Sequence, residues 1–250
     1  MRMAIAQLRV HWTLGDNLAG LLQALAQAAG AGAQLCLCGE LALPGYHRQI
    51  AQQAEPHRIA QALHAVAQAC VRHGIACAVG APAWPADGGR PFNSHHLFND
   101  AGALLARTDK DGLTFVETLF FQPGQGRPVV PLQGLRCATV LCREVEEAAL
   151  LHEQLPPGSA DLVLWPSLAR CGTLEPLAAE LAQHGGAHWV QCNAPNAPNT
   201  PDDDGLGGSV VIAPDGRVLL RLPADEAGLA VFDLGATQCQ WLPQQALAQA

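Results

Sequence analysis

Residues 34–46, QLCLCGELALPGY, join a short apolar run to a loop that begins beside a carboxylate. A short apolar run followed by turn residues is typical of a buried strand. Because α/β sheets place functional side chains just beyond the carboxyl ends of their strands, Glu40 is a candidate site residue. A carboxylate beside an apolar core tends to have a raised pKa and can act as a general base. The alternative is a solvated carboxylate that only opens a loop.

Outward from this stretch, short apolar runs alternate with helical stretches rich in alanine and leucine, which predicts a layered α/β architecture. We expect strands at about 3–10, 34–39, 75–82, 135–142, 160–166 and 188–193. We expect one helix that ends near Gly30 and two more at about 57–73 and 174–184. A further, acidic helical stretch is expected after residue 142. Two hairpins are predicted to turn at 100–102 and 214–216, and a long loop at 108–128.

Composition limits the class of protein. With 49% hydrophobic and 14% charged residues, the 250-residue chain can bury a large core, and we expect a single domain over 1–250. The net charge of −8, without a cluster of basic residues, argues against nucleic-acid binding. The amino-terminal residues do not read as a signal peptide and no apolar run is long enough to span a bilayer, so we expect a cytoplasmic protein without a membrane partner.

The nine cysteines are scattered and form no CxxC pair, a pattern of a reducing compartment. Cys36 and Cys38 are two residues apart, so on a strand they share a face. Their Cα atoms would then be roughly 6.5 to 7 Å apart, at the far edge of the range that a disulfide allows. His95 and His96 are adjacent and point to opposite faces of a strand, so they cannot easily chelate one ion. We therefore expect no metal site.

Two further segments carry reactive side chains. Cys142 ends the apolar strand of VLCREVEE (140–147) and precedes an acidic helical start, where backbone N–H groups could favour the thiolate, although most buried cysteines are inert. Lys110 is the only lysine beside thirteen arginines, which suggests a need for a compact ammonium. Glu117 follows seven residues later in the same loop and would keep that ammonium charged and oriented.

These segments, in the order glutamate, lysine, cysteine, make the chain resemble the nitrilase, or carbon–nitrogen hydrolase, superfamily from end to end. GELALPGY (39–46) looks like its glutamate motif, Lys110 with Glu117 and FFQPG like its lysine segment, and VLCRE like its cysteine motif. WVQCNAPN, GGSVVIAPDGRVLLRL and GLAVFDLG are similar to its C-terminal half.

The resemblance implies a four-layer αββα sandwich that forms homodimers or higher homo-oligomers and uses no cofactor. It implies that Cys142 attacks an amide or nitrile carbon while Glu40 transfers protons. Lys110 and the backbone N–H of Arg143 would stabilise the oxyanion, and Glu117 would support Lys110 and the substrate. The expected substrate is a small linear amide or N-carbamoyl compound, before a nitrile.

Several positions depart from the family pattern. Gly112 replaces a frequent histidine, Arg143 an aromatic residue, and Ala148-Ala149 a Pro-Glu pair. These departures leave open a binding or regulatory protein that keeps the fold with little turnover, and a metal-binding protein is a third alternative.

The substrate is not determined by these motifs. Arg143 and Arg170 could together bind a carboxylate. Glu144, Glu146 and Glu147 crowd the same region and could instead favour an amine. Tyr46, the only tyrosine, is a candidate substrate contact or simply a packed ring.

Overall fold

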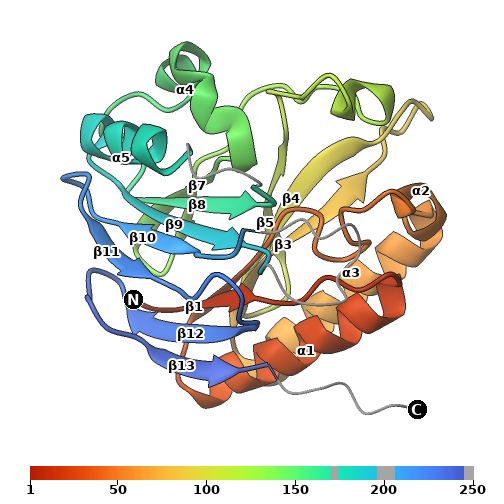
Figure 1. Cartoon of the computed structure of the whole chain (residues 1–250). Coiled ribbons are helices and arrows are strands. Elements are labelled where there is room, and N and C mark those ends of the chain that lie inside the picture. Colours follow the sequence, from red (N-terminus) through yellow and green to blue (C-terminus); the bar gives the residue numbers. More distant parts are fainter. Residues whose placement is uncertain (170–173, 196–205, 245–250) are drawn as a thin grey trace.

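Two β-sheets pack face to face in the computed structural model, which describes residues 1–169, 174–195 and 206–244 (Figure 1). The first sheet has the order β13-β12-β1-β2-β3-β4-β5. Its strands are Gln240–Pro243, Gly228–Asp233, Arg2–Gln7, Leu35–Cys38, Ala76–Ala83, Phe92–Phe98 and Leu104–Asp109. The second has the order β11-β10-β9-β8-β7-β6. Its strands are Val218–Arg221, Val210–Ile212, His188–Asn193, Leu162–Ser167, Leu135–Thr139 and Val130–Leu132.

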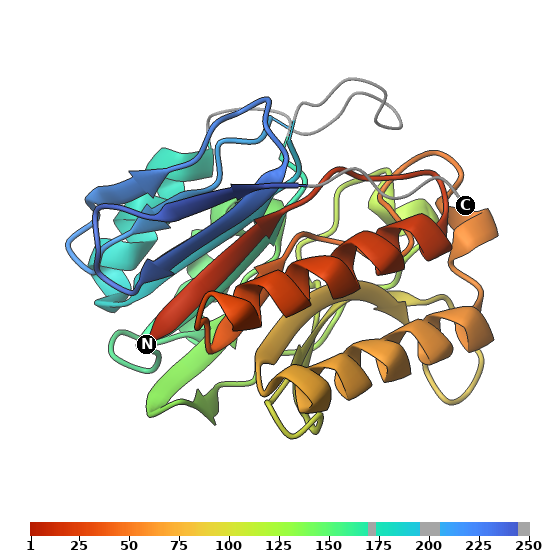
Figure 2. The same ribbon diagram turned by 90° about the horizontal axis from the view of Figure 1, so that it is seen from below.

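Helices cover the two outer faces. Helices α1 (Leu14–Gly30) and α3 (Pro56–His73) lie side by side on the first sheet, as Figure 2 shows from below. Helices α4 (Ala148–Gln154) and α5 (Leu174–Gly185) lie on the second sheet, and the short α2 (Ile50–Gln53) precedes α3. The four layers confirm the expected αββα sandwich.

Side-chain alternation along the strands builds these layers. In β2, Leu35 and Leu37 enter the core between the sheets, whereas Cys36 and Cys38 enter the core under α1 and α3. Successive side chains of a strand point to opposite faces, so one strand supplies both cores. The expectation that Cys36 and Cys38 share a face is confirmed.

Strand direction brings distant residues to one end of the sandwich. β1, β2 and β3 are parallel, as are β7, β8 and β9. β5 runs in the direction of β3, because both pair antiparallel with β4. Glu40, Lys110 and Cys142 therefore follow the carboxyl ends of β2, β5 and β7.

The structure contains several elements that the sequence pattern did not predict. The stretch 108–128 contains a 3₁₀ turn, η1 (Glu117–Leu119), and the acidic stretch begins as a second one, η2 (Cys142–Glu146), before α4. The strands β6, β12 and β13 and the short helix α2 were not predicted either. Strand β12 pairs with β1 on one side and β13 on the other. The predicted hairpins at 100–102 and 214–216 are present as β4–β5 and β10–β11.

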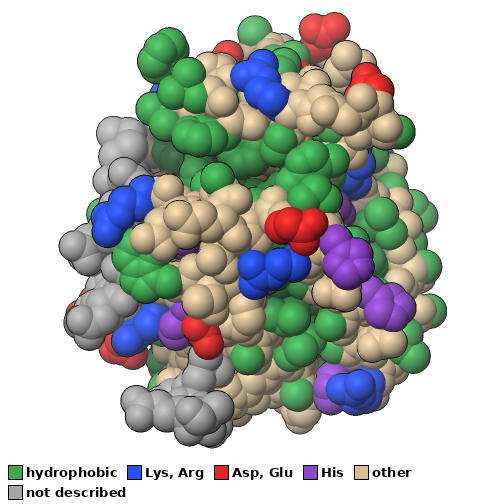
Figure 3. Space-filling model, turned by 90° about the vertical axis from the view of Figure 1, so that its right-hand side faces the viewer, with side chains coloured by type: hydrophobic (Ala, Val, Ile, Leu, Met, Phe, Trp, Pro, Cys, Tyr) green, Lys and Arg blue, Asp and Glu red, His purple; other side chains and the backbone are tan. Residues whose placement is uncertain are grey.

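Charge is dispersed over the face drawn in Figure 3, where Lys and Arg side chains stand apart and hydrophobic side chains gather in the upper part. Within the ranges that the structure covers, no helix is long and apolar enough to cross a membrane.

Candidate active site

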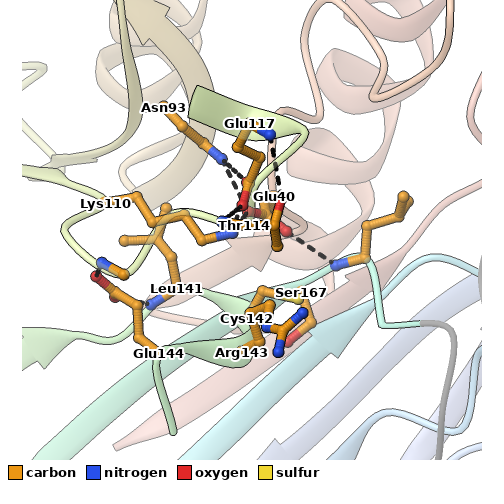
Figure 4. A network of polar contacts seen from close by, with 12 residues as sticks. Glu40, Asn93, Lys110, Thr114, Glu117, Leu141, Cys142, Arg143, Glu144 and Ser167 are labelled. Atoms are coloured by element: carbon orange, nitrogen blue, oxygen red, sulfur yellow. Dashed lines mark hydrogen bonds and ion pairs between the residues drawn. The ribbon is translucent and has the colours of Figure 1, made fainter. Parts of the chain in front are cut away.

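Lys110 lies between two carboxylates in the interior. Its Nζ atom is 2.7 Å from Glu40 Oε1 and 2.7 Å from Glu117 Oε1 (Figure 4). The three residues are 1%, 3% and 2% exposed, respectively. Two of the three ammonium donors are thus used by carboxylates, which leaves one donor for a further acceptor. The predicted pairing of Lys110 with Glu117 is confirmed, and Glu40 is not a solvated loop carboxylate.

Asn93 joins the same group and was missed from the sequence. Its Nδ2 donates to Glu40 Oε1 at 2.8 Å and to Glu117 Oε1 at 3.2 Å. It lies near the start of β4, which runs antiparallel to β3, so its position coincides with the carboxyl ends of the neighbouring strands. The side chain therefore holds the two carboxylates around Lys110.

Cys142 stands at a sharp turn between β7 and η2. Its backbone has φ 47°, a left-handed conformation that costs free energy for a residue with a Cβ. The indole Nε1 of Trp165 donates to the Cys142 carbonyl at 2.8 Å and helps to fix this turn. The residue is 7% exposed and lines a cavity of about 500 Å³ together with Glu40 and Lys110.

Burial raises the pKa of the Cys142 thiol, and the neighbouring Glu40 carboxylate, to which it is hydrogen-bonded, raises it further. Lys110 and the N–H of Leu168 act in the opposite direction but do not prevail. The expectation that the following turn favours the thiolate is therefore wrong for the free site. Desolvation of the charged form outweighs the few N–H groups of a short 3₁₀ turn. The side chain of Cys142 is therefore a thiol beside the Glu40 carboxylate.

The charges on Lys110 and Glu117 sustain each other. Burial alone would lower the pKa of Lys110, but Glu40, Cys142 and Glu117 raise it well above its ordinary value. Burial alone would raise the pKa of Glu117, but Lys110 and the N–H of Thr114 lower it. Lys110 is therefore a permanent cation at neutral pH.

A second left-handed residue follows the general-base candidate. Leu41 has φ 47°, so the chain turns sharply between Glu40 and the loop. Gly80 of β3 makes room for this turn, because a Cβ there would lie 2.2 Å from the Leu41 nitrogen. The N–H of Leu168, beyond β8, donates to Glu40 Oε2 at 3.3 Å. Both sheets thus fix the Glu40 carboxylate.

Glu144 connects the turn that contains Cys142 with the loop that follows Lys110. Its Oε2 accepts from Leu141 N–H at 2.7 Å and its Oε1 from Asp111 N–H at 2.8 Å. Arg127 Nη2 lies 3.0 Å from the same carboxylate, and both side chains are 1% exposed. Arg127 Nη1 also donates to the Thr139 carbonyl. The buried pair thus positions Asp111, which follows Lys110, and Leu141, which precedes Cys142.

The predicted substrate contacts have different environments. Tyr46 and Arg143 both line the cavity. Burial and the nearby Glu40 and Glu117 raise the pKa of Tyr46, whose hydroxyl is hydrogen-bonded to Glu117. Arg143 is paired with Glu146, and Arg170 lies outside the described residues.

Glu117 and Glu146 also line the cavity, and the rest of its lining is largely apolar, with Thr114, Val116, Leu168, Ala169 and Leu174. Within the described ranges, no three His, Cys, Asp or Glu side chains come together so as to hold a metal ion.

Comparison with known proteins identifies the class. The model of the carbon-nitrogen hydrolase family matches residues 2–244, so the chain belongs to that family. The chain is 26% identical over 243 residues to omega-amidase NIT2 of Danio rerio, an alignment that covers 90% of this chain and 85% of that protein.

Solved structures agree. The NitN amidase of Nesterenkonia sp. AN1 superposes with a TM-score of 0.84 at 28% identity, covering 94% of this chain and 92% of that one. Its cysteine-to-alanine variant in complex with butyramide gives the same TM-score and identity over 94% and 90% of the two chains. A glutamate-to-glutamine variant, with acrylamide added at the active-site cysteine, matches at TM-score 0.83 and 27% identity over 94% and 93%. The protein is an amidase-like carbon–nitrogen hydrolase.

Proposed function

We propose that the protein hydrolyses the carbon–nitrogen bond of a small linear amide, or of an N-carbamoyl compound, through a thioester on Cys142. The observation that carries this proposal is the cluster of Cys142, Glu40 and Lys110 at the wall of one cavity of about 500 Å³. A nucleophile, a base and a fixed cation are the groups that acyl transfer requires.

In the first step, the thiol sulfur attacks the amide carbon while the Glu40 carboxylate accepts the thiol proton. The carbonyl oxygen becomes an oxyanion, which the free donor of Lys110 stabilises. The backbone N–H of Arg143 is the second donor, since N–H groups in the first turn of a helix have no intrahelical acceptor. Cys142 need not be a thiolate beforehand, which fits its raised pKa.

In the second step, the tetrahedral intermediate collapses and Glu40 returns its proton to the leaving nitrogen. Ammonia departs from a primary amide, and Cys142 is left as a thioester. Glu40 then removes a proton from a water molecule, which attacks the thioester carbon. The carboxylic acid is released and the sulfur regains its proton from Glu40.

Glu117 and Tyr46 complete the proposed site. Glu117 holds Lys110 at 2.7 Å and also lines the cavity, so its carboxylate can accept from the substrate amide N–H. Tyr46 orients Glu117 through its hydroxyl and packs beside the acyl group.

The experiment is an activity screen of purified protein against amides, ureides and nitriles, with released ammonia as the readout. We expect turnover of small primary amides that Cys142→Ala abolishes. Selective alkylation of Cys142 by iodoacetamide, itself a primary amide, would accompany it. A protein that turns over none of the panel and labels its cysteines indiscriminately would instead fit the binding or regulatory alternative.

Assembly and location are also proposed. We propose a cytoplasmic homodimer. The family resemblance supports the dimer, and the scattered cysteines, eight of which are free in the described part of the chain, support a reducing compartment. Sedimentation analysis tests the dimer, which a monomer at micromolar concentration would contradict.

A further inference from the structure

The three glutamates that follow the nucleophile have different surroundings. Glu144 is buried and holds Arg127 and backbone N–H groups, so it is not available to a substrate. Glu147 is exposed. Glu146 is the member of this trio that lines the cavity, among the residues that the structure describes. Whether this turn favours a carboxylate or an amine in the substrate therefore depends on Arg143 and Glu146, which both line the cavity.

Arg143 and Glu146 neutralise each other. Nε of Arg143 donates to Glu146 Oε2 at 2.8 Å, and Nη2 donates to the same oxygen. The side chains are 50% and 34% exposed, and both belong to η2. A carboxylate that approached the guanidinium would therefore meet the Glu146 carboxylate as well, and like charges in contact oppose binding.

The buried charged residues of the cavity also oppose the binding of a second carboxylate. Glu40 and Glu117 share one cation, Lys110, at the catalytic end. Among its described lining residues, the cavity therefore has more carboxylates than cations. The cavity wall also includes the apolar side chains of Val116, Leu168 and Leu174. Such a wall favours an aliphatic chain.

We propose that Glu146 is a specificity-determining residue: by pairing with Arg143, it makes the enzyme an amidase of neutral aliphatic amides and disfavours amides that bear a second, ionised carboxylate. This inference rests on the proposed function. It assigns the guanidinium of Arg143 to Glu146 in the substrate-free site, so the carboxylate site becomes available only when Glu146 loses its charge.

Three amides of matched length provide the test: butyramide, succinamate and 3-aminopropanamide, which end in a methyl, a carboxylate and an ammonium group. For the wild type, we expect kcat/KM for butyramide to exceed that for succinamate by about tenfold or more. Glu146→Gln should raise kcat/KM for succinamate about tenfold, with butyramide changed less than about threefold.

Paired variants separate charge from packing. Arg143→Gln leaves Glu146 unpaired and should improve 3-aminopropanamide relative to succinamate. The double variant Arg143→Gln with Glu146→Gln should lose the gain on succinamate. Glu147→Gln removes an exposed carboxylate one residue further along and should leave the ratios among the three substrates unchanged.

The inference is overturned if the wild type prefers succinamate, or if Glu146→Gln changes all three substrates alike. Failure of the proposed function has a different signature: no hydrolysis of any of the three amides and no acyl adduct on Cys142.

Discussion

The ammonium of Lys110 lies 2.7 Å from the carboxylate of Glu40, although 70 positions separate the two residues in the chain. Both are almost fully buried, and an ion pair removed from water depends on its geometry for its stability. Glu117 and Asn93 complete that geometry. The arrangement keeps a compact cation at a fixed point beside the thiol.

Lys110→Arg tests whether this point requires an ammonium. The guanidinium keeps the charge but is too wide to sit between Glu40 and Glu117, so the oxyanion loses a preorganised donor. We expect kcat to fall on the order of 10²-fold or more. A kcat within about threefold of wild type, which is under about 0.7 kcal/mol, would contradict the role given to Lys110.

Asn93→Leu tests the residue that bridges the carboxylates. Without its two hydrogen bonds, Glu40 and Glu117 can move away from Lys110, and we expect kcat to fall at least about tenfold while the protein stays folded. Ser94→Ala is the matched control, because the Ser94 hydroxyl is also buried but bonds Asp109. Equal losses of kcat in both variants would mean that Asn93 only stabilises strand β4 and does not position the two carboxylates.

Arg127→Met tests the buried pair with Glu144. Removal of one partner leaves an uncompensated buried charge, and we expect the free energy of unfolding to drop by about 3–5 kcal/mol, measured by denaturant titration. Arg136→Met is the control, because the Arg136–Asp161 pair is 52% and 36% exposed and should contribute under about 1 kcal/mol. Similar effects in the two variants would argue against the assigned role of the buried pair.

The protonation state of Cys142 gives a pH prediction. Its pKa is raised, and a raised acid pKa keeps the thiol protonated to higher pH. The ultraviolet thiolate absorbance lost in Cys142→Ala should therefore be absent up to about pH 9, beyond the ordinary thiol pKa of about 8.5. Glu40→Gln removes a carboxylate that raises this pKa, so the transition should move to lower pH. A wild-type transition near neutrality would show a preformed thiolate.

The sequence predicted Glu40, Lys110 and Cys142 because each follows the end of a β-strand. Asn93 could not be found in that way, since it lies at the start of an antiparallel strand and its partners come from two other segments. Glu144 and Glu146 are two residues apart, and only the turn of η2 decides that the first is buried and the second meets the cavity. The protonation state of Cys142 could not be predicted, because it depends mainly on the burial of the thiol, and the residues of the following turn do not determine that burial.

The central claim is that Cys142 becomes acylated. Intact-protein and peptide mass spectrometry with a slow amide substrate should show an added acyl mass on the peptide that contains Cys142. Cys142→Ala should lack the adduct, whereas Cys137→Ala should retain it with activity within a few-fold, since Cys137 belongs to the core between the sheets. An adduct that survives Cys142→Ala, or turnover that is equally lost in both variants while both stay folded, would contradict the account.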